Sequence, residues 1–162
     1  MPTSFRSGFC GGLIAAILLG LFLIWLWQPE CQVRHHTENF LRAIAHKSWT
    51  AAADFIDSDY HDQWGDDRAR VLERMREGLR YVRGVRINAS NPTLRIENRR
   101  AIWSGKIMID GDRSEMMGLL EERVNSLATP FELEWRQVSA KPWDWKLIRV
   151  SNSALEIPAD ID

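Results

Sequence analysis

The chain has 162 residues, 45% of them hydrophobic, and a formal net charge of −1, because 21 Lys and Arg nearly balance 22 Asp and Glu. This balance, with acids interspersed among the basic residues and no recognition motif, argues against a nucleic-acid-binding protein. Both cysteines, Cys10 and Cys31, lie in or beside an N-terminal apolar segment. The remaining residues are enough for one domain but not two. Because they contain no cysteine, they can form neither an internal disulfide nor a cysteine-based zinc site.

Residues 8–27 contain no charged side chain. A helix of that length is about 30 Å long, which matches the hydrocarbon core of a bilayer. The sequence therefore predicts a single membrane span, with Trp25 and Trp27 at the membrane–water interface and Pro29 ending the helix. A cleaved signal peptide is the main alternative, but its apolar core is about 7–15 residues long and ends in a small-x-small cleavage site, which this segment lacks. A buried helix of a soluble protein is the third possibility.

Two further expectations concern this span. Small residues recur every four positions on one helix face, at Gly8, Gly12, Ala16 and Gly20. Such a face lets a second helix approach closely, which predicts a homodimer, although small residues are also common in membrane helices by chance. The sheet is the other surface through which two chains could pair. The positive charges that flank the span, Arg6 before it and Arg34 with Arg42 after it, nearly balance. Because a short N-terminal tail usually stays in the cytoplasm, we expect an extracytoplasmic C-terminal domain, periplasmic if the organism is bacterial.

Two amphipathic helices are expected after the apolar segment. The first should begin at Thr37, a helix cap, and run to Ile56, because its apolar residues return every three or four positions. The second should be capped by Asp66 or Asp67 and end near Gly84, since glycine tolerates the left-handed conformation of a C-cap. Its apolar stripe comprises Val71, Leu72, Met75, Leu79 and Val82.

From Val85 onward apolar residues alternate with a period of two, which predicts strands. The expected strands are 85–89 and 93–97, divided by Asn91-Pro92, then 101–109 after a turn at 97–100, 131–136 and 143–150. Asp112 and Glu115 resemble a capping box and predict a helix before the fourth strand. Its apolar face comprises Met116, Leu119, Leu120, Val124 and Leu127. Residues 153–162 show no sustained period and are expected to form a flexible tail.

Helices followed by a mostly antiparallel sheet predict an α+β fold in which one sheet face packs on the helices. Three segments, ADFIDSDY at 53–60, TPFELEWRQV at 129–138 and PWDWKLIRVSN at 142–152, together with the long first helix, resemble the NTF2-like, or SnoaL-like, superfamily. The resemblance covers residues 34–152, behind an anchor at 1–30. It implies a cone-shaped, cystatin-like sheet that encloses a pocket between itself and the helices.

Members of this superfamily use the pocket for proton-transfer catalysis or for binding. The residues expected near its mouth are Asp57, Asp59, Tyr60, His61 and Asp62. A ketosteroid-isomerase-like enzyme needs a base beside a carbon acid and a donor for the oxyanion, which these residue types can supply. The alternative is that the aspartates cap helices and Tyr60 fills the core. The spacing fits neither a calcium loop nor a transition-metal site, so we expect no metal and no cofactor.

Aromatic side chains are the other candidates for the pocket wall. The set comprises Trp49, Tyr60, Trp103, Trp135 and Trp145, which could instead simply fill the core. Because no catalytic set is complete, the favoured function is a membrane-anchored, non-catalytic module that binds a small apolar ligand or a protein partner. A membrane-tethered lyase or isomerase that uses the residues from Asp57 to Asp62 is the alternative, so whether the chain is an enzyme stays open.

Overall fold

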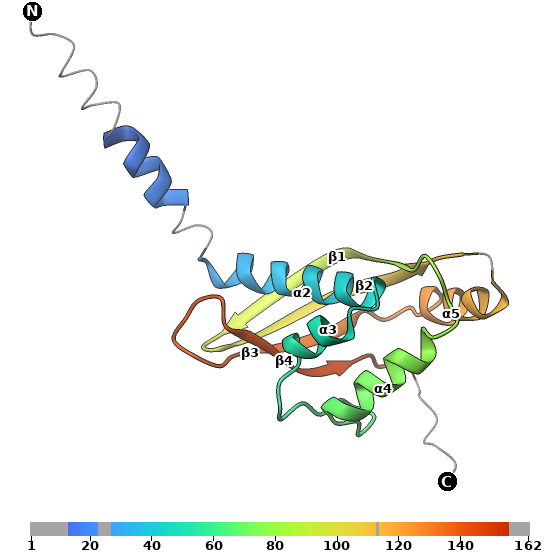
Figure 1. Ribbon diagram of the computed structural model, residues 1–162. Helices are drawn as coiled ribbons and strands as arrows, with labels where there is room; N and C mark the ends of the chain where they lie inside the picture. The colour runs from blue at the N-terminus through green and yellow to red at the C-terminus, as the bar shows by residue number, and fades with distance from the viewer. Residues whose placement is uncertain (1–12, 23–26, 113, 156–162) are drawn as a thin grey trace, which may run out of the picture.

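The computed structural model describes residues 13–22, 27–112 and 114–155 (Figure 1). Beyond a helix at residues 13–22, its elements are α2 (Pro29–Ala45), α3 (Trp49–Phe55), α4 (Arg68–Gly78), β1 (Arg86–Glu97), β2 (Arg100–Asp110), α5 (Glu115–Asn125), β3 (Phe131–Gln137) and β4 (Trp145–Ser151). The four strands form one antiparallel sheet in the order β1-β2-β3-β4. Helix α2 packs on β1 and β2, α3 packs between α2 and β4, and α5 contacts β2, which confirms the predicted α+β arrangement.

The helix at residues 13–22 projects away from the sheet (Figure 1). Its apolar side chains face outward, and Leu18 and Leu19 are 61% and 60% exposed. Among the described residues, no helix has both the length and the apolar character needed to cross a bilayer. The predicted span at 8–27 includes Gly8, Gly12 and Trp25, which lie outside the described residues, whereas Ala16 and Gly20 belong to the helix.

The predicted boundaries of the first helix are wrong at both ends. Helix α2 begins at Pro29, because proline has no N–H to leave unsatisfied in the first turn and its fixed φ suits a helix. Thr37, the predicted cap, is instead buried in the middle of α2. The chain breaks at Lys47, whose φ of 55° ends the helix and whose ammonium donates a hydrogen bond to the carbonyl of Val82. Helix α3 then starts afresh at Trp49.

The cap of α4 is Asp67, one of the two residues that the sequence predicted for this role. Its side chain accepts a hydrogen bond of 2.9 Å from the backbone N–H of Arg70. The helix ends at Gly78 rather than at Gly84, so the predicted end is more than a turn too late. Gly84 does have a positive φ, 62°, but in the loop that leads to β1.

Helix α5 forms where a helix was predicted, with a different cap and a partly different buried face. Ser114, not Asp112, is the cap, and its hydroxyl accepts a hydrogen bond from the N–H of Met117. Met117 is fully buried, whereas Met116 and Leu119 are exposed, because the helix is rotated by about one residue relative to the predicted stripe.

The sheet has four strands where five were predicted. The two expected at 85–89 and 93–97 are one strand, β1, with a register shift between Ser90 and Thr93 where Asn91 has a φ of 52°. The predicted hairpin turn at 97–100 is confirmed, since Glu97 pairs with Arg100. Trp143 lies before β4 and is 51% exposed, so the last strand starts two residues later than predicted.

The chain after β4 is held against the domain as far as Leu155. The side-chain oxygen of Asn152 accepts hydrogen bonds of 2.9 Å from the N–H groups of Ala154 and Leu155. The Leu155 carbonyl in turn accepts a 2.9 Å hydrogen bond from the indole of Trp64. Ala154 and Leu155, near the start of the expected tail, are therefore bonded to the folded domain, and residues 156–162 lie outside the described residues.

His36 is packed among aromatic rings on the buried side of α2. Its ring meets those of Phe55 and Trp135 edge-on at 5.8 and 6.0 Å, and its Nδ1 lies 2.8 Å from the carbonyl of Gln32. Burial lowers the pKa of His36 below its ordinary value of 6.5. The neutral form of the ring is therefore the one that the fold stabilises.

We expect this histidine to make the protein less stable in mild acid. Its pKa is lower in the folded state than in the unfolded state, so the unfolded chain binds more protons and the free energy of unfolding falls as the pH drops from about 7 to about 5. Replacing His36 with Phe should flatten this part of the dependence, as measured by urea unfolding of the detergent-solubilised protein at several pH values. Identical slopes for the wild type and His36→Phe would contradict the assignment.

Candidate functional site

An apolar cavity of about 370 Å³ lies between the helices and the inner face of the sheet. Its wall takes side chains from α2, α4, α5 and all four strands. The apolar lining includes Phe40, Ile44, Met75, Ile107, Leu120 and Leu133. This volume falls within the range of about 300–1,000 Å³ that is typical of small-molecule pockets.

The cavity exists because the helices leave part of the inner sheet face uncovered. On β2, alternation turns Ala101, Trp103 and Gly105 inward, where they are buried, and the same face continues through Ile107 and Ile109. These two isoleucines are only half-buried although they point inward, because they line the cavity. Each Å² of such apolar surface that a ligand covers stabilises the complex by about 25 cal/mol.

Tyr60 and Asp62 supply polar groups to the cavity wall. The Tyr60 hydroxyl donates to Oδ2 of Asp62 across 3.5 Å, while Oδ1 accepts hydrogen bonds of 2.9 Å from the N–H groups of Trp64 and Asp66. Burial, followed by the Asp62 carboxylate, raises the pKa of Tyr60 far above its ordinary value of 10.0. The hydroxyl therefore stays neutral at any physiological pH, with its single hydrogen directed to Asp62 and its oxygen available as an acceptor in the cavity wall.

Two charged side chains complete this polar corner. Nε of Arg74 lies 3.1 Å from Oδ2 of Asp66, which is buried, and Nε of Arg70 lies 3.8 Å from its Oδ1. Because Arg74 and Asp66 both line the cavity, they neutralise each other there. The sequence pointed to Asp66 only as a helix cap and gave no signal for Arg74, whose partner lies eight positions earlier.

The other predicted acid residues face away from the cavity. Oδ1 of Asp57 and Oδ2 of Asp59 lie 2.9 and 3.2 Å from the same nitrogen of Arg136 on β3. Burial alone would raise the pKa of Asp57, but the backbone N–H of Asp59 and the Arg136 guanidinium outweigh it and hold this pKa below its ordinary value. His61 is exposed, with its ring 3.2 Å from the carbonyl of Asp59.

A turn in the backbone separates the five predicted site residues into two groups. The segment runs beside β4, with the N–H groups of Asp57, His61 and Gln63 donating to carbonyls of that strand. Between these bonds the chain turns at Ser58 and Asp59, where the N–H of Tyr60 donates to the carbonyl of Asp57. Tyr60 and Asp62 enter the cavity wall, while Asp57, Asp59 and His61 do not.

The aromatic candidates also divide. Tyr60 lines the apolar cavity, and Trp103 lines a separate groove of about 450 Å³ between α2 and β1. Trp135 and Trp145 are buried in the core, and Trp49 packs partly buried against it. None of these three tryptophans lines the apolar cavity.

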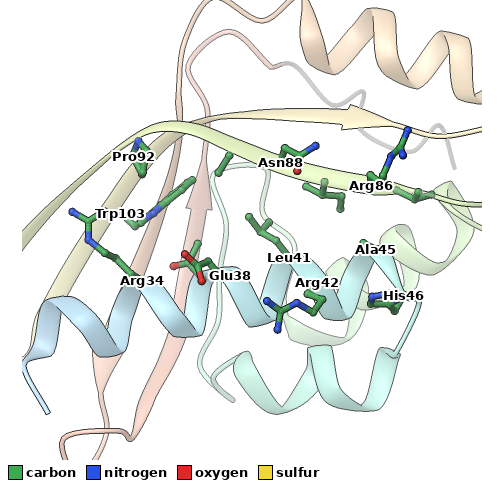
Figure 2. A pocket seen from close by; sticks show the side chains of 14 residues that line it. Arg34, Glu38, Leu41, Arg42, Ala45, His46, Arg86, Asn88, Pro92 and Trp103 are labelled. Carbon is green, nitrogen blue, oxygen red and sulfur yellow. The ribbon is translucent and has the colours of Figure 1, made fainter. Parts of the chain in front are cut away.

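The groove between α2 and β1 carries mixed charges. Figure 2 shows Arg34 and Glu38 beside Trp103 at one end and His46 at the other, with Arg42 between. The fully charged side chains that line it are three arginines, Arg34, Arg42 and Arg86, and one acid, Glu38, so positive charge predominates. Within the described ranges, no group of three His, Cys, Asp or Glu side chains is placed to hold a metal ion.

Comparisons with known proteins identify the fold. No family model matches this sequence, and no curated protein matches it. The structure is similar to Bd1075 of Bdellovibrio bacteriovorus, with a TM-score of 0.56 and 10% identity over 74% of this chain, but only 38% of that one. It is also similar to an NTF2-like protein of unknown function from Pseudomonas putida KT2440, with a TM-score of 0.56 and 10% identity over 75% of this chain and 82% of that one.

A third similar structure is a proposed ketosteroid isomerase from Shewanella frigidimarina, with a TM-score of 0.55 and 12% identity over 76% of this chain and 95% of that one. At such low identity these likenesses concern the fold alone. They confirm the predicted NTF2-like fold.

Proposed function

We propose that this chain is a membrane-anchored, non-catalytic binding module whose NTF2-like domain holds a small apolar ligand. The observation that carries the proposal is the cavity of about 370 Å³, because its wall is apolar except for one corner. Ligand pockets are typically apolar with a few placed polar groups that fix orientation.

The polar corner indicates the chemistry of the ligand. Arg74 and Asp66 neutralise each other, so neither attracts a charged ligand strongly. The Tyr60 hydroxyl, whose hydrogen is donated to Asp62, and the Asp62 carboxylate offer hydrogen-bond acceptors. This arrangement suits an uncharged, largely aliphatic molecule with a hydroxyl group at one end.

The membrane anchor is part of the same proposal. It is supported by the uncharged stretch at 8–27 and by the outward-facing apolar side chains of residues 13–22, which are costly to leave in water. The N-terminus would lie in the cytoplasm and the domain outside it. Pairing of two chains through Gly8, Gly12, Ala16 and Gly20 stays a prediction.

Photolabelling tests the cavity directly. The probe is dodecanol that carries a diazirine and an alkyne, applied to the full chain in lipid nanodiscs and mapped by peptide mass spectrometry. We expect labelled peptides from β2 and α5, and a loss of that labelling of at least about tenfold when Ile107→Trp fills the cavity. The control is Ile102→Trp on the opposite, exposed face of β2. Equal labelling of both variants would overturn the proposal.

A second candidate, an isomerase, is favoured by the presence of both Tyr60 and Asp62 in the cavity wall. A neutral tyrosine can stabilise an oxyanion, and a carboxylate can move a proton. Oδ1 of Asp62, however, already accepts two backbone hydrogen bonds, which suits a structural role. We expect no conversion of androst-5-ene-3,17-dione to its conjugated isomer. Turnover that Asp62→Asn abolishes would establish the second candidate instead.

A further inference from the structure

One end of the domain brings together the start of α2 and two loops of the sheet. Strands β1 and β3 run in the same direction, so the β1–β2 turn and the β3–β4 loop lie at the same end (Figure 1). The N–H of Gln137 donates to the carbonyl of Arg99 across 2.8 Å and its side-chain amide donates to the carbonyl of Lys141 across 2.9 Å. Gln137 thus ties the two loops together.

Two exposed tryptophans meet at this end. The ring centroids of Trp27 and Trp143 are 6.5 Å apart, and the side chains are 49% and 51% exposed. The β3–β4 loop that carries Trp143 is shaped by hydrogen bonds from Val138 N–H to Asp144 C=O and from Asp144 N–H to Lys141 C=O. Val138 itself is 42% exposed. An ordered loop therefore presents apolar surface outward, which marks an interaction site.

Two basic residues belong to the same two loops, Arg99 to the β1–β2 turn and Lys141 to the β3–β4 loop. Among the described residues, Arg99 and Lys141 form no ion pair. Indoles half in water beside free basic groups are typical of side chains at the membrane–water interface, where the cations reach lipid phosphates.

We propose that this end of the domain docks on the bilayer surface, with Trp27 and Trp143 among the head groups and Lys141 and Arg99 on lipid phosphates. The position of residues 13–22 identifies the partner as lipid, because this helix with exposed apolar side chains ends five residues before Trp27. The inference rests on the proposed anchor and adds a second attachment, separated from Trp27 by more than a hundred residues in sequence. Two attachments fix the direction of α2, and with it the orientation of the ligand cavity, relative to the membrane.

Tryptophan quenching in vesicles tests the docking. The full chain is reconstituted into phosphatidylcholine vesicles whose acyl chains are brominated near the head group, and the quenched fraction of the fluorescence of its eight tryptophans is measured. Removing a quenched tryptophan lowers this fraction, whereas removing an unquenched one raises it. We expect Trp143→Phe to lower it. The control Trp49→Phe, on α3 beyond the far end of α2, should raise it.

Flotation of the same vesicles distinguishes failure of the docking from failure of the anchor. If the chain floats with the vesicles but Trp143→Phe raises the quenched fraction or leaves it unchanged, the docking proposal is overturned and the anchor stands. If the intact chain does not float at all, both proposals fail together. A lowered fraction with flotation intact supports the docked loop.

Discussion

Replacing Asn152 with alanine should lower the free energy of unfolding by about 2–4 kcal/mol, because a buried side chain that makes five hydrogen bonds is lost. Asn152 is 2% exposed. Its amide nitrogen donates to the carbonyls of Thr129 and Pro130 at 2.9 and 3.2 Å. Its oxygen accepts from the Thr129 hydroxyl and from the N–H groups of Ala154 and Leu155, each at 2.9 Å. Alanine removes all five bonds and leaves the Thr129 and Leu155 groups, which are partly buried, without this partner.

The measurement is urea unfolding of the detergent-solubilised protein at neutral pH, with Asn88→Ala as the control. Asn88 is exposed on β1, so its loss should change the free energy of unfolding by less than about 0.5 kcal/mol. Because Leu155 and Trp64 line the cavity, Asn152→Ala should also weaken labelling by the dodecanol probe. A destabilisation equal to that of Asn88→Ala would show that Asn152 does not hold this wall.

The sequence predicted the elements better than their ends. Periodicity identified β2 and β3, because alternation of buried and exposed side chains is a property of the strand itself. The end of α2 was missed because Lys47 adopts a left-handed conformation, and its ammonium bonds a carbonyl 35 residues away. A local sequence pattern gives no information on such a distant partner. Thr37 was predicted as a cap because its residue type and its position before an apolar stripe are typical of one.

The candidate site shows the same limit more sharply. Neighbouring polar residues from Asp57 to Asp62 suggested one cluster, yet the turn at Ser58 and Asp59 divides them between two sides. The sequence predicted a break in the helix at this point, but it did not reveal which side chains reach the cavity. The partner of Asp57, Arg136, could not be found in this way, because tertiary folding brings it close from 79 positions away in the chain.

Replacing Trp135 with alanine should lower the free energy of unfolding by about 3–5 kcal/mol, the largest effect of any single change considered for this domain. Trp135 is fully buried at the centre of the core, where its ring meets His36 and Phe40 edge-on at 6.0 and 6.3 Å. Its indole N–H has no hydrogen-bond partner among the described residues. Burying an unpaired donor is costly, so phenylalanine, which removes that donor and retains an aromatic ring, should cost less than about 1.5 kcal/mol.

A comparison of Trp135→Phe with Ile107→Trp also distinguishes a core residue from a residue that lines the cavity. Trp135 was a candidate for the pocket wall, but it packs under α2 and does not line the apolar cavity. Trp135→Phe should therefore keep labelling by the dodecanol probe within about twofold of the wild type, while its unfolding midpoint in urea shifts modestly. Ile107→Trp should show the reverse, with labelling lost and the fold retained. Loss of labelling in Trp135→Phe without unfolding would place this tryptophan at the ligand after all, and the cavity would then need to extend beneath α2.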